Sequence, residues 1–327
     1  MKILVTGGAG YIGSITNREL VKAGFETVIF DNFSEGHKEL VRETRYIEGD
    51  LRNKEVIEKV FADEHFDGVV HFAAKALAGE SMEKPYEYFE NNIIGGLNLL
   101  EAMQRGGCKK IVFSSTCAVY GYPKSLPVDE NAVQKPLSVY GEPKRMFESI
   151  LDWYGKLYSI ASTSLRYFNA AGATEDGKLG EDHKTETHII PLAIKAAMGN
   201  TSFTLYGDKY DTPDGTCLRD YIHVVDLAAA HVLALQQLTK TGVGGAFNLG
   251  TQKPYSNKEV ITMVKKITGK DFPVTIALPR EGDPAAIYAD STRAKQELGW
   301  EPKYDNLEEV VKTAWEWHRN HPEGFAS

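Results

Sequence analysis

Short apolar segments alternate with amphipathic ones through the first two-thirds of the chain, and this alternation restricts the possible folds most. The apolar segments have the length and composition of buried strands: residues 2–6, 26–32, 45–51, 68–74, 109–115 and 162–170. The segments between them have helical periodicity: residues 15–24, 54–64, 91–106 and 141–158. Apolar strands separated by helices predict a parallel sheet covered on both faces, and right-handed crossovers make it doubly wound.

The pattern loosens after about residue 171, where Gly, Asp and Thr become frequent and only short strands are expected, at 203–207 and 272–278. A chain of 327 residues is long enough for two domains. We therefore predict a doubly wound α/β domain over residues 1–171 and a smaller α/β lobe over residues 172–327. Some segments of the second part are expected to return to the first domain.

Composition narrows the classes of ligand and compartment. The formal net charge of −8 argues against a broad nucleic-acid surface, although helix N-termini and single arginines can still bind small anions. The three cysteines lie far apart and form no C-x-x-C, which predicts free thiols in a reducing compartment. The first predicted strand begins at residue 2, before which no secretory signal fits, and no apolar run reaches membrane-spanning length. We expect a cytoplasmic protein that binds neither nucleic acid nor membrane.

The segment TGGAGYIG links the first predicted strand to the first predicted helix. It matches G-x-G-x-x-G through Gly8, Gly10 and Gly13, and a wider pattern that starts at Gly7. Glycines here permit a tight turn and let backbone amides approach a pyrophosphate at a helix N-terminus. Asp31 ends the second predicted strand, where a carboxylate can bind both hydroxyls of an adenosine ribose and repel a 2′-phosphate. The sequence therefore predicts NAD in preference to NADP.

Tyr-x-x-x-Lys, a catalytic spacing in nicotinamide enzymes, occurs twice, as Tyr120–Lys124 and as Tyr140–Lys144. A lysine lowers the pKa of a tyrosine only if its ammonium stays close to the phenolate. Residues four apart on a helix share a face, and the residues after Tyr140 have helical periodicity. The segment around Tyr120 is rich in turn-forming residues. Tyr140 and Lys144 are therefore predicted to be the functional pair.

Three hydroxyl residues, Ser114, Ser115 and Thr116, end the fifth predicted strand. Ligands bind at the carboxyl ends of strands in sheets of this kind. A hydroxyl there can hydrogen-bond the substrate oxygen that gives its proton to Tyr140. We predict catalytic roles for Tyr140, Lys144 and Thr116, and a cofactor contact for Ser114.

These motifs together resemble the extended short-chain dehydrogenase/reductase family, and within it the UDP-sugar 4-epimerases. The resemblance covers nearly the whole chain and rests on segments such as DNFSEG, GDLRN, KPYEYFENN, LRYFNAAGA, DGTCLRDYIHVVDLA and REGDPAAIYAD. It implies interconversion of UDP-galactose and UDP-glucose through a 4-keto intermediate. Tyr140 would be the acid/base, Lys144 would bind the nicotinamide ribose and Thr116 would assist. A homodimer is implied as well.

Matched by motif, the resemblance implies two sets of ligand contacts. The NAD contacts are Gly7, Gly10, Tyr11, Ile12, Gly13, Asp31, Asn32, Phe33, Ser34, Gly36, Asp50, Leu51, Phe72, Ala73, Ala74, Asn91, Ser114, Tyr140, Lys144 and Phe168. The UDP-sugar contacts, in residues 172–327 and at the acid/base group, are Thr116, Tyr140, Asn169, His188, Thr204, Leu205, Tyr206, Arg219, Arg280 and Asp283. An arginine pair suits a diphosphate, because guanidinium donors match its oxygens.

One position departs clearly from the family pattern, and two others bear on the substrate contacts that the resemblance implies. Lys75 lies one place before Ala76, the position at which some relatives carry a lysine that contacts the cofactor, so its role is open. His188 stands where asparagine is often found. Ile287 occupies a position that tunes the space around the C2 substituent of the sugar. UDP-N-acetylhexosamines and UDP-pentoses are therefore alternative substrates.

Other chemistries have weaker support. Sugar-nucleotide dehydratases and UDP-glucuronate decarboxylases share this fold, but they commonly carry an acidic residue where Cys117 or Ala118 stands. A non-enzymatic NAD sensor would be free to lose Tyr140 and Lys144. No G-x-S-x-G is present, which argues against a serine hydrolase of that type. The spacing of the two histidines in HKTETH is not usual for zinc on a helix, so no metal site is predicted.

Overall fold

The computed structural model describes residues 1–41, 43–199, 201–280 and 282–325. A seven-stranded parallel sheet has the strand order β10-β6-β5-β4-β1-β2-β3, which confirms the predicted doubly wound α/β fold. Its strands are β1 (Lys2–Thr6), β2 (Glu26–Asp31), β3 (Tyr46–Glu48), β4 (Gly68–His71), β5 (Lys110–Thr116), β6 (Ala161–Tyr167) and β10 (Gly245–Leu249).

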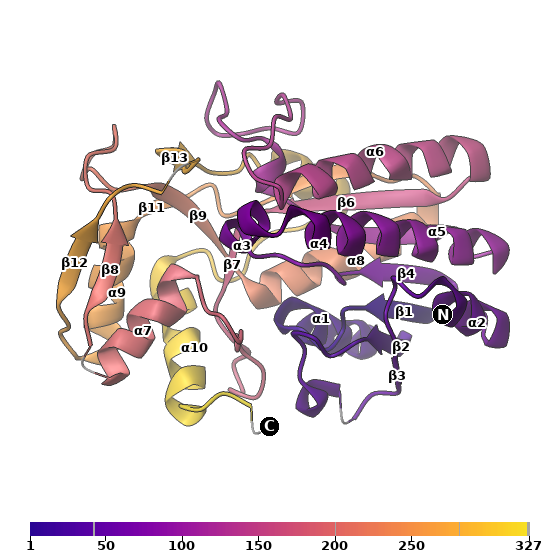
Figure 1. Cartoon of the computed structure of the whole chain (residues 1–327), viewed down its shortest axis with the longest axis horizontal. Helices are drawn as coiled ribbons and strands as arrows, with labels where there is room; N and C mark the ends of the chain where they lie inside the picture. Colours follow the sequence, from indigo (N-terminus) through magenta and orange to yellow (C-terminus); the bar gives the residue numbers. More distant parts are fainter. Residues whose placement is uncertain (42, 200, 281, 326–327) are drawn as a thin grey trace.

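Helices cover both faces of this sheet (Figure 1). On one face lie α1 (Tyr11–Lys22) and α8 (Val224–Thr241), and on the other lie α2 (Lys54–Asp63), α5 (Gly95–Arg105) and α6 (Gly141–Tyr158). Alternate residues of β1 serve the two layers: Ile3 and Val5 belong to one buried cluster and Leu4 to the other. A strand buried on both faces must be apolar throughout, which is the pattern that the sequence displays.

A second, smaller part contains two further sheets (Figure 1). Four short strands form one of them: β7 (Asn169–Ala171), β9 (Leu218–His223), β11 (Pro254–Ser256) and β13 (Ala286–Ile287). The other pairs β8 (Phe203–Tyr206) with β12 (Val274–Ala277) in parallel. The helices of this part are α7 (Ile189–Gly199), α9 (Asn257–Thr268) and α10 (Leu307–Asn320), which share one apolar cluster.

Short helical segments complete the fold. Between β4 and α5 lie α3 (Ala78–Glu83), α4 (Pro85–Phe89) and the π-helical turn η2 (Glu90–Ile94), which continues directly into α5. The other single turns are η1 (Lys38–Val41), η3 (Cys117–Val119) and η4 (Ala294–Leu298). In the part of the chain that the structure describes, no helix is both long enough and apolar enough to cross a membrane.

Two elements beyond residue 171 belong to the large sheet. The helix α8 packs against α1 and its apolar residues join the buried cluster of β1, while β10 pairs in parallel with β6 at the sheet edge. The parallel pairing requires a crossover, and α8 supplies it. The second half of the chain therefore completes the first domain.

The strand expected over residues 162–170 is two strands in the structure. β6 ends at Tyr167, and β7 leaves the large sheet to pair with β9. Phe168 lies between them, and its N–H donates to the Leu249 carbonyl at 3.3 Å. The chain passes from one part of the molecule to the other at this point. The strand order of the large sheet also reverses between β1 and β4, and ligands bind at such a switch point.

Candidate active site

The glycine loop joins β1 to α1 at the carboxyl edge of the sheet. Gly7 has φ of +73°, and a Cβ there would lie 2.5 Å from the Ala73 backbone nitrogen. At Gly13 a Cβ would collide with the backbone of Gly7. Glycine is required at both positions, because the turn is left-handed at one and closely packed at the other. The turn leaves the N-terminus of α1 as an anion-binding position, which suits a pyrophosphate.

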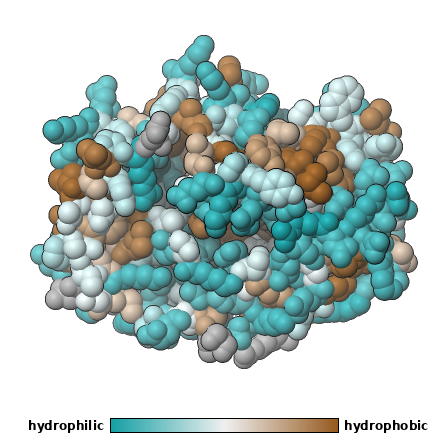
Figure 2. All heavy atoms as spheres, in the orientation of Figure 1, coloured by the Kyte–Doolittle hydropathy of each residue, from teal (hydrophilic) through white to brown (hydrophobic). Residues whose placement is uncertain are grey.

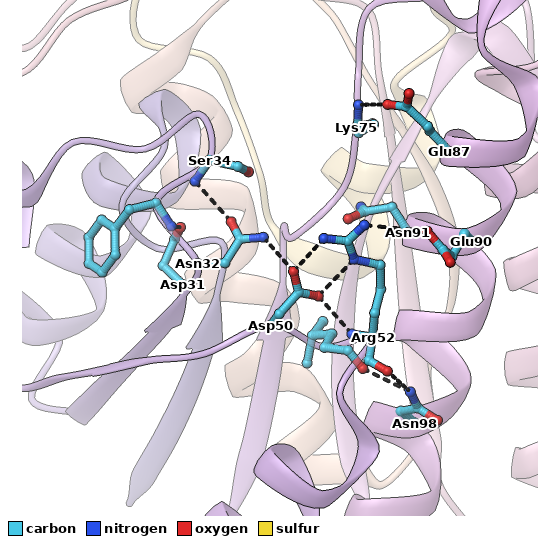
Figure 3. A network of polar contacts seen from close by, with 12 residues as sticks. Asp31, Asn32, Ser34, Asp50, Arg52, Lys75, Glu87, Glu90, Asn91 and Asn98 are labelled. Atoms are coloured by element: carbon cyan, nitrogen blue, oxygen red, sulfur yellow. Dashed lines mark hydrogen bonds and ion pairs between the residues drawn. The ribbon is translucent and has the colours of Figure 1, made fainter.

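Asp31 lies beside this loop at the end of β2 (Figure 3). Its carboxylate accepts hydrogen bonds from the backbone N–H groups of Ala9, at 2.9 Å, and Phe33, at 2.8 Å. Burial raises the pKa of Asp31, and these backbone donors oppose the rise. Each carboxylate oxygen has a second lone pair, which can accept from a ribose hydroxyl. The loop and the acid together fit the adenosine diphosphate half of NAD.

A polar network continues from Asp31 toward the predicted adenine side (Figure 3). Asp50 accepts from the Asn32 side-chain amide at 3.0 Å and pairs with Arg52 at 2.7 Å. The Arg52 guanidinium lowers the pKa of Asp50 to about 2. Arg52 also reaches Glu90 at 3.3 Å, so the loops after β2 and β3 are tied to η2.

The remaining predicted cofactor residues lie in the loops after β1, β2, β3 and β4, or in α1, η2, β5 and the β6–β7 junction. They are Tyr11, Ile12, Ser34, Gly36, Leu51, Phe72, Ala74, Asn91, Ser114 and Phe168. The Tyr11 hydroxyl donates to the Gly172 carbonyl at 2.6 Å, which joins the glycine loop to the chain after β7. The predicted set therefore gathers along one edge of the sheet and at the passage between the two parts.

Lys75 has a partner already (Figure 3). Its ammonium lies 2.5 Å from the Glu87 carboxylate. Its backbone is held by Asn92, whose side chain accepts from the Lys75 N–H at 2.8 Å and donates to the Lys75 carbonyl at 3.0 Å. The ion pair with Glu87 would have to open before the Lys75 ammonium could contact a cofactor.

Lys144 is buried beneath the carboxyl end of β5. Its ammonium donates to the Ser114 carbonyl at 2.7 Å and lies 4.9 Å from the centre of the Phe113 ring. The side chain is in α6, whose bounds, Gly141–Tyr158, are those expected from the sequence. Burial lowers the pKa of Lys144 to about 7, and the Glu148 carboxylate opposes that effect.

Tyr140 directly precedes α6 and has helical backbone angles, φ −63° and ψ −44°. Burial raises the pKa of its phenol, the neighbouring Tyr167 adds to the rise, and a hydrogen bond with the Thr116 hydroxyl lowers it. Thr116 thus stands beside the phenol at the end of β5. Burial outweighs the hydrogen bond, so the pKa of the phenol lies above its ordinary value in the ligand-free protein.

Tyr120 has a different environment from Tyr140. Its hydroxyl donates to the Asn248 side chain at 2.6 Å and accepts from the Arg166 guanidinium at 2.9 Å. The side chain is 1% exposed, whereas Lys124 is exposed in the loop that follows η3. Tyr120 is a buried packing residue whose hydroxyl is fully engaged.

Glu148 is a residue of this site that the sequence reasoning missed. Its buried carboxylate pairs with Arg166 at 2.5 Å and accepts from the Ser115 hydroxyl at 2.5 Å. It raises the pKa of Lys144, against the effect of burial. Its position four residues after Lys144 on a helix was the available signal, since such residues share a face.

Two arginines of the second part lie where a UDP-sugar is predicted to bind. Arg219, on β9, donates to the carbonyls of Leu218 and Pro284 at 2.9 and 2.8 Å, and lies 3.3 Å from the Asp283 carboxylate. The Arg280 guanidinium lies 4.2 Å from the centre of the Tyr206 ring. Arg219 is therefore fixed by its neighbours, and Arg280 stacks on an aromatic ring that could also face a base.

The predicted uracil contacts on β8 have side chains that point in opposite directions. Thr204 and Tyr206 are exposed, whereas the Leu205 side chain is 3% exposed and belongs to the apolar cluster of the second part. Alternate residues of a strand face opposite ways, so only the backbone of Leu205 is available to a ligand.

Two other predicted positions are partly or fully buried. Asn169 donates from its side chain to the Asp220 carbonyl at 3.1 Å. Ile287 is 5% exposed and packs in one apolar cluster with Phe168. This cluster therefore joins a residue predicted to lie near the sugar, Ile287, to one predicted to contact the cofactor, Phe168.

His188 precedes α7 and lies among acidic groups. Its Nδ1 is 2.7 Å from a Glu181 oxygen and 2.9 Å from a Glu186 oxygen. Burial lowers the pKa of His188, but the two carboxylates outweigh it and raise the value to about 10. His183 approaches the same carboxylates. The side chain predicted to contact the sugar is thus engaged with this cluster through Nδ1.

Comparison with known proteins agrees with this geometry. The NAD dependent epimerase/dehydratase family matches residues 3–250. A UDP-glucose 4-epimerase from Lactobacillus helveticus is 48% identical over 99% of each chain. The structure of UDP-glucose 4-epimerase from Bifidobacterium longum in complex with NAD+ and UDP has a TM-score of 0.94 at 40% identity, over 99% of this chain and 100% of that one. The Brucella ovis enzyme in complex with NAD has a TM-score of 0.93 at 43% identity, over 96% and 97%.

These matches confirm the resemblance drawn from the sequence motifs. The predicted cofactor is confirmed too, because the family description specifies NAD and both solved relatives contain it. The match to the family extends from β1 to the end of β10, which is the large sheet with its glycine loop and acid/base residues. The chain therefore belongs to the NAD dependent epimerase/dehydratase family.

Proposed function

We propose that this protein is a UDP-glucose 4-epimerase, an isomerase that interconverts UDP-galactose and UDP-glucose with NAD bound. The observation that carries the proposal is the placement of Tyr140, Lys144 and Thr116 at the carboxyl end of β5, in a chain with the NAD-binding glycine loop. Relatives of the same length have that activity in their names, at 42–48% identity.

Tyr140 acts as the base and then as the acid at the sugar 4-hydroxyl. Thr116 lies beside the phenol, lowers its pKa and is placed to contact the same sugar oxygen. NAD, which the glycine loop and Asp31 would hold, would supply hydride acceptance and return at C4, and its nicotinamide ring would bring a positive charge into the site. Ionisation of Tyr140 needs such positive charge, because burial raises the pKa of the phenol. Lys144 adds a second positive charge when it is protonated, a state that the Glu148 carboxylate favours.

The UDP moiety anchors the sugar. Arg219 and Arg280 provide guanidinium donors for the diphosphate, and Tyr206 provides an aromatic face for the base. A sugar held only through its UDP can turn after oxidation at C4 and present its other face. Tyr140 then returns the proton to the oxygen, and the configuration at C4 is inverted.

The residues after Thr116 favour epimerisation over elimination or decarboxylation. Cys117 and Ala118 supply no carboxylate at the place where dehydratases and decarboxylases carry one. Burial raises the pKa of Cys117 to about 12, so its thiol is a poor base. An NAD sensor without catalysis would be free to lose the Tyr140 phenol, which this chain keeps beside Thr116.

We also infer a homodimer formed through α5 and α6. Figure 2 shows apolar side chains gathered on the face that carries these two helices. Ile94, Trp153 and Leu157 are 48%, 58% and 66% exposed. Large apolar groups exposed on neighbouring helical segments usually mark a protein–protein interface. In a two-fold dimer both subunits use the same patch, so a second copy of this chain can cover these groups.

A cytoplasmic location is part of the proposal. Cys108, Cys117 and Cys217 are all free thiols, which suits a reducing compartment. The substrates are nucleotide sugars, and no disulfide is needed to hold either part of the fold.

The test of the proposed function is conversion of UDP-galactose by the purified protein. With no nicotinamide added, UDP-glucose is expected to appear on anion-exchange chromatography, since NAD is retained through each turnover. Formation of a UDP-4-keto-6-deoxy sugar instead would assign the site to a dehydratase. A decarboxylase would leave UDP-galactose unchanged and would release CO2 from UDP-glucuronate, which is supplied in a parallel reaction. Binding of NAD without any change in the sugar would favour the sensor.

A further inference from the structure

The segment Glu181–His188 connects the β7 region to α7 and brings four potential metal ligands together. These are Glu181, His183, Glu186 and His188. One ligand atom from each residue lies within 4.8 Å of the other three. The proposed epimerisation uses none of the first three residues, so the cluster needs a separate explanation.

The distances within the cluster match a small coordination sphere. His188 Nδ1 lies 2.7 Å from Glu181 Oε1 and 2.9 Å from Glu186 Oε1. His183 Nδ1 lies 3.2 Å from Glu181 Oε1 and 3.6 Å from Glu186 Oε2. A tetrahedral zinc ion with bonds of about 2.0–2.1 Å has ligand atoms about 3.3–3.4 Å apart. The two His183 distances lie near this spacing, and the two His188 distances are hydrogen-bond lengths that a bound zinc ion would lengthen by about 0.5 Å.

The carboxylates are buried, and their hydrogen-bonding capacity is not used up. The side chains of Glu181 and Glu186 are each 4% exposed. Glu181 Oε1, His183 Nδ1 and Glu186 Oε2 are buried atoms without a well-directed hydrogen bond to any residue that the structure describes. Without a metal, the imidazolium groups of His183 and His188 pair with these two carboxylates. A divalent cation can displace the imidazolium protons and bind these three atoms at once.

The donor set selects the class of metal. Two imidazole nitrogens and two carboxylate oxygens form a mixed set that suits zinc and its transition-metal neighbours. Calcium and magnesium prefer oxygen ligands alone. Four protein ligands fill a tetrahedral zinc ion and leave no open position, which is the arrangement of a structural site.

The residues around the cluster leave it accessible to solvent and connect it to the glycine loop. His183 lines a cavity of about 290 Å³ together with Lys195 and the end of α10, so an ion can reach the cluster from solvent. The His183 ring also meets Tyr11 edge-on, with ring centres 6.3 Å apart. A metal at the cluster would therefore fix the segment between the glycine loop and the start of α7.

We propose that Glu181, His183, Glu186 and His188 form a structural zinc site that holds residues 181–188 between Tyr11 and α7. The spacing of the histidines, which argues against zinc ligands on a helix, is no obstacle. These residues precede α7 and lie in an irregular loop, where separation in the sequence does not fix separation in space.

The test uses the full chain without a histidine tag. The protein is loaded with zinc, passed over a chelating resin and analysed by plasma mass spectrometry. One zinc per chain is expected in the wild type. His183→Gln and Glu181→Gln should each weaken zinc binding by about 100-fold or more in a chelator competition, since each removes one ligand. His65→Gln is the matched control, because His65 is 70% exposed and lies outside the cluster; it should bind zinc as the wild type does.

X-ray absorption at the zinc edge of the loaded wild type does not depend on how the variants fold. Nitrogen and oxygen neighbours at about 2.0–2.1 Å, with an imidazole signature, are expected. The proposal is overturned if the wild type binds zinc no more tightly than His183→Gln. A zinc spectrum with sulfur neighbours would also overturn it, because the ion would then belong to the cysteines.

Discussion

At the residue scale, the buried Tyr140 phenol is the group on which the proposed chemistry depends. Tyr140→Phe keeps the ring and removes the hydroxyl that exchanges a proton with the sugar. We expect kcat for UDP-galactose to fall by about 10²–10⁴-fold, the usual contribution of a positioned acid/base. NAD should still be bound, because the other predicted cofactor contacts remain, and both quantities can be measured on the same preparation.

Tyr120→Phe is the control that the repeated sequence pattern offers. It breaks hydrogen bonds to Asn248 and Arg166 and should reduce the free energy of unfolding by about 1–3 kcal/mol. Turnover by the folded protein should remain near the wild-type value. If Tyr140→Phe kept more than a tenth of the activity, or if Tyr120→Phe lost as much as Tyr140→Phe, the assignment of the acid/base would be wrong.

The burial of Lys144 should appear in the pH dependence of stability. Its pKa falls from 10.5 to about 7 in the folded protein, so the unfolded chain binds more protons between these values. Stability should therefore rise with pH in this window because of Lys144, and the cost of its burial is fully present below pH 7. With the cofactor removed, the free energy of unfolding of the wild type should rise by about 3 kcal/mol between pH 7 and pH 10 because of Lys144. Lys144→Met should lack this rise.

Urea unfolding at pH 6, 8 and 10 measures this difference. The change of side-chain packing in Lys144→Met contributes an offset that does not depend on pH, so the slope is the informative quantity. A difference between the two proteins that stayed constant across the window would mean that Lys144 is protonated in the folded state throughout.

At the element scale, helices that a local sequence pattern defines could be predicted from the sequence. The helix expected over 141–158 has those bounds as α6, because its apolar positions keep one face throughout. The first helix begins at Tyr11, four residues before the expected start, because the glycine loop itself ends in a helical turn. Both outcomes follow from local backbone preference and periodicity.

Elements set by tertiary contacts were not predictable in the same way. Residues 162–170 are uniformly strand-forming, yet the chain changes sheets at Phe168 because β9 offers a second pairing partner. Leu205 is a predicted ligand contact whose side chain lies in the core, because of its alternate position on β8, so only its backbone is available to a ligand. The cluster of Glu181 and His183 forms in an irregular loop, where no periodicity exists to reveal it.

The strand β9 positions a predicted substrate contact. It places Arg219 against the Pro284 carbonyl and Asp283, in a fixed orientation toward the predicted diphosphate. Arg219→Met should raise KM for UDP-galactose by about 10- to 100-fold, since it removes charged hydrogen bonds to the substrate. Arg293→Met is the control, because Arg293 pairs with Glu297 on the surface and should leave KM unchanged. Equal KM values for the two variants would remove Arg219 from the substrate site.

At the scale of the whole molecule, the proposed dimer predicts which surface substitutions change the oligomeric state. Leu157→Asp places a charge on the exposed face of α6 and should convert a dimer to a monomer in analytical ultracentrifugation. Val243→Asp changes a side chain of the same 66% exposure, in the turn after α8, and should stay dimeric. A wild type that sedimented as a monomer at micromolar concentration would contradict the inferred interface.

The central claim is that the protein inverts C4 by removing and returning the same hydride. UDP-galactose with deuterium at C4 tests it most directly, with no nicotinamide added and the product examined by mass spectrometry. The account predicts UDP-glucose that retains the deuterium at C4. Product in which solvent hydrogen has replaced the deuterium would show that C4 is inverted by proton exchange, and an absence of UDP-glucose even with NAD supplied would show that this sugar pair is not the substrate.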